Sequence, residues 1–255
     1  MKIASWNVNG IRARIEHVTA WIKSNQPDVL ALQETKVMDD MFPFEAFTSL
    51  GYEAMIYGQK SYNGVALLSK KPPKECTKGI DDFIDEQTRV ISGIYEGVKI
   101  IDVYIPNGQS VGSEKFEYKM RWLKNLHRYL EASIKINERI VILGDFNIAP
   151  QDIDVHDPIV WKDKVLCSDE EREWLSKIEN IGFIDSFRLF DQEEGLFSWW
   201  DYRMASYRRK MGMRIDLILV SEALRKNCIK SYIDEAPRAL ERPSDHTPVL
   251  VELSL

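Results

Sequence analysis

The chain has 255 residues, of which 44% are hydrophobic and 29% charged, and its formal net charge is −6 at pH 7. This composition is typical of a globular protein, and the length fits one large domain, which we expect to span residues 1–255. The negative charge excludes a uniformly basic nucleic-acid coat protein, so a polyanion would have to be bound through a local patch or a metal ion.

Cysteine usage and the absence of long apolar runs indicate the compartment. Cys76, Cys167 and Cys228 are far apart and lack a C-x-x-C or histidine companion, which argues against a zinc site or a disulfide framework. The first residues lack a signal-peptide core, and no apolar run reaches the length of a membrane span. We therefore expect a cytoplasmic protein without a membrane partner.

The first half of the chain alternates between short apolar runs and amphipathic segments. Periodicity predicts strands at 2–6, 29–33, 52–57 and 65–69, and helices at 16–25 and 44–50. Residues 70–86 are polar and rich in chain breakers, so we expect a surface loop there. Glu96-Gly97 separates the runs 89–95 and 99–104, which predicts an antiparallel hairpin.

The second half begins with the clearest helical pattern in the chain, at 113–136. A strand is expected at 140–144, and residues 148–167 lack periodicity, which is typical of a long ordered functional loop. A capping box from Ser168 to Glu171 predicts a helix that ends near Gly182. Further strands are expected at 197–202, 215–220, 229–234 and 249–253.

The predicted strands form two batches, each with hairpins and a helical crossover, and no linker or repeat separates them. This order predicts an α/β (α+β) fold in which two mixed β-sheets pack together and helices cover their outer faces, giving a four-layer sandwich.

The segment 139–147 contains the strongest candidate for a site. Four consecutive apolar residues predict a strand buried on both faces, and Gly144 allows a sharp turn or a close approach of the backbone. If the chain stays extended, the side chains of Asp145 and Asn147 point the same way and offer oxygen ligands to a hard cation. The alternative is an Asx turn that only ends the strand.

Other polar residues lie at the ends of the predicted strands. Because exits and entries of neighbouring strands share a rim in a mixed sheet, these residues can meet at one edge. Each alone has an ordinary explanation, since polar residues are common at strand ends. The set comprises Asn7, Glu34, the turn 104–107, Asp145, Asn147, Asp216, Asp245 and His246.

Six motifs resemble the exonuclease III family of apurinic/apyrimidinic (AP) endonucleases, within the endonuclease/exonuclease/phosphatase superfamily. They are Ser-Trp-Asn-Val-Asn-Gly at 5–10, Leu-Gln-Glu-Thr-Lys at 32–36, Tyr-Ile-Pro-Asn-Gly at 104–108, Leu-Gly-Asp-Phe-Asn at 143–147, Arg-Ile-Asp at 214–216 and Ser-Asp-His-Thr-Pro-Val at 244–249. They cover the chain from end to end and imply a DNase I-like fold. Gly-Asp-Phe-Asn and Ser-Asp-His mark only the superfamily, whereas Gln-Glu-Thr-Lys and Phe-Ser-Trp-Trp-Asp-Tyr-Arg favour the DNA-repair branch.

The resemblance implies a Mg²⁺ site, for which Mn²⁺ is a possible substitute. Glu34 is the foremost candidate ligand, because carboxylate, amide and water oxygens suit this ion. The metal would neutralise the scissile phosphate and the leaving 3′ oxygen. The full candidate ligand set is Asn7, Glu34, Asp145, Asn147, Asp245 and His246.

The same resemblance implies catalytic roles for five residues. Asp145 would orient or deprotonate the attacking water, and Asn147 would donate a hydrogen bond to the developing charge. His246 would contact the phosphate or move a proton, and Asp216 would hold its ring, although an isolated histidine is more often structural. Tyr104 would donate its phenol or act as a phenolate; the alternative is a half-buried tyrosine at a strand end.

Double-stranded DNA with abasic sites or 3′ ends is the expected partner, bound by a monomer. The run 202–214 is basic and has no acid, although such runs are often only solvated loops. Within and beside it, Arg203 and Arg208 would contact phosphates, Met213 would act as an apolar wedge, and Trp199 would wall a pocket for a base-less sugar. The remaining candidate contacts are Asn9, Arg12, Lys36 and Asn107.

Two other functions remain open. One is a superfamily relative that acts on lipid or RNA phosphodiesters, although such enzymes are not expected to carry the Trp-rich segment and basic loop. The other is a non-catalytic DNA-binding member, which is disfavoured because every expected site residue is present. Residues 149–167 depart from better-known members of the repair family, which leaves open the balance between incision at abasic sites and trimming of 3′ ends.

Overall fold

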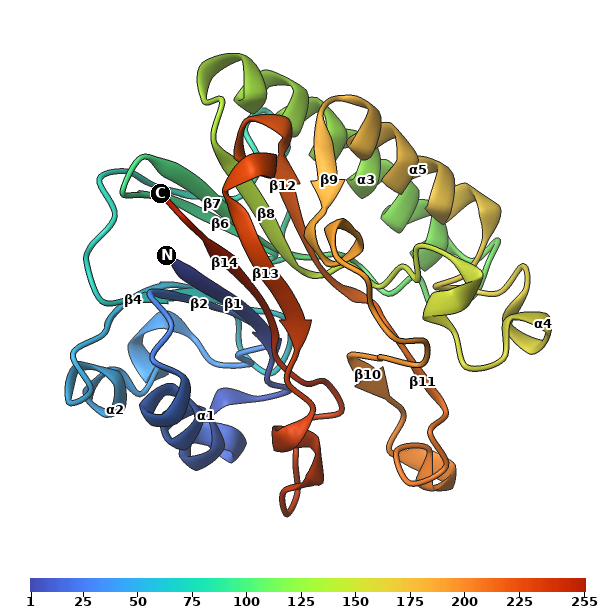
Figure 1. Ribbon diagram of the computed structural model, residues 1–255, viewed down its shortest axis with the longest axis horizontal. Helices are drawn as coiled ribbons and strands as arrows, with labels where there is room; N and C mark the ends of the chain where they lie inside the picture. Colours follow the sequence, from blue (N-terminus) through green and yellow to red (C-terminus); the bar gives the residue numbers. More distant parts are fainter.

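Two six-stranded sheets pack face to face in the computed structural model, which describes residues 1–255 (Figure 1). The first has the order β13 (Cys228–Ile233), β14 (Val249–Leu253), β1 (Lys2–Asn7), β2 (Val29–Gln33), β4 (Val65–Ser69) and β3 (Glu53–Tyr57). The second has the order β5 (Cys76–Lys78), β6 (Val90–Tyr95), β7 (Val98–Tyr104), β8 (Ile140–Asp145), β12 (Asp216–Ser221) and β9 (Phe183–Asp185). Each sheet is mixed, because β1–β2 and β7–β8 are parallel and the other pairs are antiparallel.

Helices cover the two outer faces. On the first sheet lie α1 (Ile11–Asn25) and α2 (Phe44–Thr48), and on the second lie α3 (Glu114–Ile136) and α5 (Asp169–Asn180) (Figure 1). This arrangement confirms the expected four-layer sandwich of two mixed sheets. None of the helices combines the length and the apolar character that a membrane crossing requires.

Strand β8 shows how the layers are held together. Val141 and Leu143 belong to the apolar layer between the sheets, whereas Ile140 and Ile142 pack toward α3 and α5. All four are fully buried, so the strand has no polar face, as its unbroken apolar sequence predicts. Burying each such side chain is worth about 1.5–3 kcal/mol relative to exposure, which fixes the strand and the residues that follow it.

Gly144 is required where β8 reaches the rim. Its φ is +145°, and a Cβ at this position would lie 1.8 Å from the carbonyl oxygen of Val103 on β7. Close approach of the two parallel strands is therefore possible only with glycine. The close approach brings Asp145 beside Tyr104.

The structure corrects several expected boundaries. The segment 70–86 contains an edge strand, β5, whose three residues are all exposed and so give no apolar signal. Of 197–202, only β10 (Trp199–Trp200) is a strand, and it pairs with β11 (Gly212–Met213). The loop 148–167 contains a 3₁₀ turn and the short helix α4 (Pro158–Trp161), β9 was not expected, and α1 begins at Ile11, earlier than its periodicity predicts.

Candidate active site

Six strand ends meet at one edge of the sandwich. The parallel register of β1 and β2 places Asn7 beside Gln33, the residue before Glu34. In the second sheet, Asp145 lies opposite Tyr104 on one side and Asp216 on the other. The expected gathering of polar strand ends therefore follows from the pairing of the strands.

Asp245 and His246 reach this rim through contacts with β1. Ser244 Oγ donates to the carbonyl oxygen of Asn7 at 2.7 Å, and the indole of Trp6 donates to the carbonyl oxygen of His246 at 3.2 Å. These bonds tie the turn before β14 to the end of β1. The turn therefore has a fixed position relative to the end of β1.

Asn7 joins the carboxylates of the two sheets. Its Nδ2 donates to Glu34 Oε1 at 2.8 Å and to Asp145 Oδ2 at 2.9 Å. Lys36 Nζ lies 2.8 Å from the other Glu34 oxygen, Oε2. Although burial opposes ionisation, the Lys36 ammonium and these hydrogen bonds hold the pKa of Glu34 below its usual value. Glu34 is therefore ionised at neutral pH.

His246 lies between two buried carboxylates. Its Nδ1 is 2.8 Å from Asp216 Oδ2, and its Nε2 is 3.7 Å from Asp145 Oδ2. Burial lowers the pKa of His246, but the carboxylates of Asp216 and Asp145 outweigh it and raise the pKa to about 10. Burial raises the pKa of Asp145 to about 7, despite the opposing effect of His246. The pair therefore holds a proton that it can exchange with a bound reactant.

Asp145 and Asn147 form the Asx turn that was the alternative reading of this segment. The backbone N–H of Asn147 donates to Asp145 Oδ1 at 2.9 Å, and Asn147 has φ +50°. The chain is therefore not extended here, and that part of the prediction is wrong. The turn does not remove Asp145 from the site, because it engages Oδ1 and leaves Oδ2 to face Asn7 and His246.

Two amides follow the strands β7 and β8. Asn107 Nδ2 donates to Asn147 Oδ1 at 3.0 Å, and Asn147 Nδ2 donates to the carbonyl oxygen of Ile105, also at 3.0 Å. Since a primary amide has two N–H donors, each side chain keeps one donor for a further acceptor.

Tyr104 has a largely buried phenol. Burial raises its pKa well above the usual value, and the carboxylates of Glu34 and Asp145 add to the effect. The guanidinium of Arg89 lies 4.6 Å from the centre of the ring on one face. The arrangement favours the protonated phenol, a hydrogen-bond donor, over the phenolate.

The residues present fit a hard divalent cation. Ligand atoms of Glu34, Asp145 and His246 all lie within 4.8 Å of one another, and two of the three side chains are carboxylates. Burial makes ionisation of Asp145 unfavourable, and a cation would supply the missing positive charge. Carboxylate oxygens suit Mg²⁺ or Mn²⁺.

The oxygens of the other three candidate ligands accept hydrogen bonds from protein groups. Asn7 Oδ1 accepts from the backbone N–H of Asn9, and Asn147 Oδ1 accepts from Asn107. The carboxylate of Asp245 lies outside the cluster of three. It accepts from Asn9 Nδ2 at 2.9 Å and from the indole of Trp199 at 3.1 Å. These oxygens are therefore engaged by protein donors.

The candidate DNA contacts divide into exposed and buried side chains. Arg12 and Arg208 are exposed, and Arg203 is exposed although it is paired with Asp201 at 2.6 Å. Lys36 and Asn9 lie beside each other at the rim, and Lys36 Nζ donates to Asn9 Oδ1 at 2.5 Å. Lys36 and Arg203 therefore border the site, Lys36 beside Glu34 and Arg203 in a hollow that Asn107 also lines.

The structure contradicts the predicted role of Met213 as an apolar wedge in DNA. Met213 is fully buried and packs with Leu166, Cys167 and Ile215, so its side chain is not available as a wedge. The exposed methionine of this loop is Met204, with 70% of its surface accessible and φ +58°. Met204 follows Arg203 directly in the basic run.

Two hollows flank the turn that carries Asn107. One, of about 480 Å³, is lined by residues that include Trp161, Leu166, Trp199 and Arg203. The other, of about 840 Å³, extends from Tyr104 past Arg89 to Tyr62 and Gln59. Asn107 lines both, so a chain-like ligand could cross the rim from one hollow to the other.

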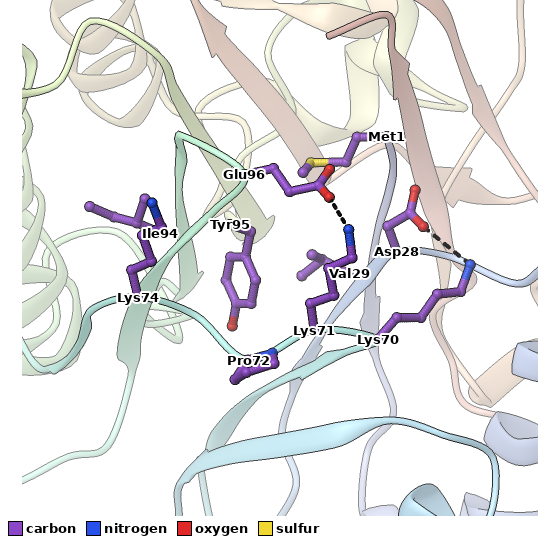
Figure 2. A pocket seen from close by; sticks show the side chains of 10 residues that line it. All are labelled: Met1, Asp28, Val29, Lys70, Lys71, Pro72, Lys74, Ile94, Tyr95 and Glu96. Atoms are coloured by element: carbon purple, nitrogen blue, oxygen red, sulfur yellow. Dashed lines mark hydrogen bonds and ion pairs between the residues drawn. The ribbon is translucent and has the colours of Figure 1, made fainter.

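A third pocket, of about 260 Å³, lies at the opposite ends of the strands (Figure 2). Met1, Val29 and Tyr95 line it together with several lysines. Two of these are paired, Lys70 with Asp28 at 3.1 Å and Lys71 with Glu96 at 2.6 Å. It contains none of the rim residues, so we place the chemistry at the rim.

Comparison with known proteins shows which family has this sequence pattern and fold. Residues 4–246 match the model of the Endonuclease/Exonuclease/phosphatase family. The chain belongs to this family. It is 40% identical to exodeoxyribonuclease III of Haemophilus influenzae, over 99% of both chains.

Two solved structures share the fold of this protein over its full length and over their own. A 3′ phosphatase from Neisseria, solved with a product DNA hairpin, has a TM-score of 0.98 and 41% identity over 100% of each chain. An AP endonuclease from Archaeoglobus fulgidus has a TM-score of 0.96 and 37% identity, also over 100% of each chain. The DNase I-like fold expected from the motifs is thus confirmed.

Proposed function

We propose that the chain is a Mg²⁺-dependent DNA-repair phosphodiesterase that cuts the backbone 5′ to abasic sites, and removes 3′-blocking groups and 3′ nucleotides. The observation that carries this proposal is the cluster of Glu34, Asp145 and His246, which lies at a rim between two hollows. The names of the similar proteins support it, since they comprise an exodeoxyribonuclease, a 3′ phosphatase and an AP endonuclease.

Incision at abasic sites and trimming of 3′ ends break the same type of bond, P–O3′. Water attacks phosphorus, the P–O3′ bond breaks, and the 3′ oxygen leaves as a hydroxyl once it gains a proton. Incision at an abasic site then yields a 3′-OH end and a 5′ sugar phosphate, and removal of a 3′ phosphate yields a 3′-OH end and inorganic phosphate. One set of catalytic residues can therefore serve both substrates.

Asp145 is the proposed acceptor of the proton from water. Its Oδ2 is buried and lies beside His246 Nε2, and burial raises the pKa of this carboxyl above its usual value, which favours its acting as a base. Asp216 holds Nδ1 of His246, which fixes the ring and aims Nε2 toward the phosphate. When bound, Mg²⁺ or its substitute Mn²⁺ would be held through the Glu34 carboxylate and would neutralise charge on the phosphate and on the leaving oxygen.

Hydrogen-bond donors surround the proposed phosphate position. Asn147 and Asn107 each have one amide N–H without a protein acceptor, and Tyr104 lies beside Asp145 in the sheet. Donors arranged in advance stabilise negative charge that grows in the transition state without costly reorganisation. These three side chains are therefore proposed to bind the phosphoryl oxygens.

We propose that double-stranded DNA is held by the cations around the rim and by Trp199. Arg12, Lys36, Arg203 and Arg208 would contact phosphates, and Met204 replaces Met213 as the apolar wedge. We also propose that the protein acts as a cytoplasmic monomer, because the site is complete within one chain and the three cysteines are free.

A second candidate is an enzyme that trims 3′ ends and cuts poorly at abasic sites. The observation that favours it is Leu166, which walls the hollow beside Trp199 and holds a left-handed φ of +75°. A leucine side chain there leaves less room for a sugar turned out of the duplex.

Two labelled duplexes separate the candidates, one with an internal abasic analogue and one with a 3′ phosphate at a nick. We expect Mg²⁺-dependent cutting 5′ to the abasic analogue as well as removal of the 3′ phosphate. Activity on the 3′ phosphate alone would favour the second candidate. Inactivity on both, in Mg²⁺ and in Mn²⁺, would contradict a DNA-repair function and direct attention to lipid and RNA phosphodiesters.

A further inference from the structure

Lys119 on α3 has a fully buried ammonium behind the site. Its Nζ donates to the carbonyl oxygen of Asn147 at 2.7 Å, to that of Asn107 at 3.2 Å and to Glu171 Oε1 at 2.5 Å. An ammonium has three N–H donors, so each has one acceptor. Three separate segments of the chain therefore converge on a single side chain.

Glu171 is the buried counter-ion, and its own bonds reach the loop 148–167. Oε1 also accepts from the backbone N–H of Leu166 at 3.0 Å. Oε2 accepts from the backbone N–H of Ser168 at 3.1 Å and from its hydroxyl at 2.6 Å. Both side chains of the ion pair have no exposed surface. The carboxylate therefore closes the end of the loop and caps α5.

A buried ion pair contributes little to stability, because the cost of desolvating two charges offsets their attraction, and apolar replacements are often equally stable. A contribution to stability therefore does not explain well why a lysine is buried here. The groups that Lys119 binds explain it better. The two carbonyl groups that it binds belong to Asn107 and Asn147, whose side chains are joined at 3.0 Å.

The same ion pair reaches the hollow beside Trp199. Leu166, whose N–H is bound by Glu171, lines this hollow together with Asn107. The loop 148–167 is thus connected through Glu171 and Lys119 to the backbone of Asn107 and Asn147. The contacts are direct at every step.

We propose that Lys119, through its ion pair with Glu171, is a positioning residue that sets the Asn107 and Asn147 amides against the loop 148–167. The inference rests on the proposed function, because it takes these amides to bind the scissile phosphate. Without Lys119, the two turns after β7 and β8 lose their shared donor and separate from each other and from the loop.

The test uses Lys119→Met, Glu171→Gln and the double variant, with Lys177→Met as the control. Lys177 pairs with Glu173 on the exposed side of α5, at 2.8 Å, and touches none of the rim residues. Lys119→Met leaves a buried carboxylate unpaired and should be destabilised. The double variant carries no charge at this position. The amide oxygen that replaces a carboxylate oxygen of Glu171 can still accept from Ser168, but the amide nitrogen cannot accept from the Leu166 N–H, so this variant should recover part of the lost stability.

Measurements of kcat and KM distinguish a positioning role of Lys119 from a purely structural one. For both Lys119 variants we expect kcat on the 3′-phosphate duplex to fall about 10- to 100-fold, with KM changed by less than about threefold, since a misplacement of about 1 Å has costs of this size. The control should match the parent protein. A stable double variant with the parent kcat would overturn the inference and leave the ion pair a structural role. If the parent protein cuts neither duplex, the proposed function fails first and this inference fails with it.

Discussion

His246 Nδ1 lies 2.8 Å from Asp216 Oδ2, although the two residues are 30 positions apart and adjoin strands of different sheets. The packing of the two sheets therefore creates the pair. The Asp216 carboxylate fixes which ring nitrogen of His246 faces Asp145, and it raises the pKa of the imidazole.

Asp216→Asn should keep the fold and lose activity. The amide is nearly the same size as the carboxyl but cannot stabilise an imidazolium, and it favours the wrong tautomer. We expect kcat on either DNA substrate to fall about 10²- to 10⁴-fold, with an unchanged circular dichroism spectrum. Asp40→Asn is the control, because Asp40 is exposed and makes no hydrogen bond or ion pair with a rim residue. A folded Asp216→Asn variant with undiminished kcat would refute the assigned role.

Glu34→Gln should weaken metal binding more than folding. The substitution removes one of two carboxylates in the donor cluster, and the affinity for a hard cation depends on the number of charged ligands. We expect the Mg²⁺ concentration for half-maximal activity to rise at least about tenfold, and Mn²⁺ binding measured by calorimetry to weaken in parallel. Unchanged affinity in both assays would remove Glu34 from the metal site.

The two methionines of the basic loop should behave oppositely. Met213→Ala removes a fully buried side chain and should lower the free energy of unfolding by about 2–5 kcal/mol. Met204→Ala should leave unfolding unchanged within about 0.5 kcal/mol and weaken binding to damaged duplex. Urea unfolding and fluorescence anisotropy measure the two effects. Stability loss in the Met204 variant, or none in the Met213 variant, would contradict the assigned burial.

Arg208→Ala tests the electrostatic contact with DNA. Removing one phosphate contact should reduce the slope of log affinity against log salt by about 1. Lys71→Ala is the control, because Lys71 lies at the opposite end of the strands (Figure 2) and should leave the slope unchanged. Equal slopes for Arg208→Ala and the parent protein would exclude Arg208 from the DNA surface.

Asp102 predicts a pH dependence of stability. It is fully buried, Gln33 Nε2 donates to its Oδ1 at 2.7 Å, and its Oδ2 has no partner. Burial raises its pKa well above the usual value. A raised pKa means that its contribution to stability is complete below the unfolded pKa and is lost as pH rises through the folded pKa.

Asp102→Asn does not titrate and keeps an acceptor for Gln33. Its stability relative to the parent protein should therefore increase from about pH 5 to about pH 8. Urea unfolding at the two pH values measures the difference. A difference that stays constant, or one that falls with rising pH, would show that the Asp102 carboxyl is not held protonated.

Elements whose sequence pattern is local could be predicted from the sequence, and elements that depend on distant contacts could not. The unbroken apolar run of β8 and the Ser168–Glu171 capping box fixed their elements, because local patterns determine both. The exposed edge strand β5 had no such pattern. Its pairing with β6 can be seen only in three dimensions.

Site residues show the same division. Asp145 was proposed as a site residue from its position at the end of a buried strand, and of the two conformations considered after it the Asx turn is the one that forms. The burial of Met213 depends on its pairing opposite Trp199, across a loop, and so has no local signature. Lys119 lay within a correctly predicted helix, but a lysine is rarely fully buried, so nothing in the sequence separated it from a solvated side chain.

The most direct test of the account is to follow cleavage of the abasic and 3′-phosphate duplexes in ¹⁸O-water, with the parent protein and with Asp145→Asn. We predict Mg²⁺-dependent products with 3′-OH ends and ¹⁸O in the released phosphate group, and a loss of about 10²- to 10⁴-fold in kcat for the variant. Products with ¹⁸O in the 3′ hydroxyl, or full activity of Asp145→Asn or of the parent protein in chelator, would contradict it.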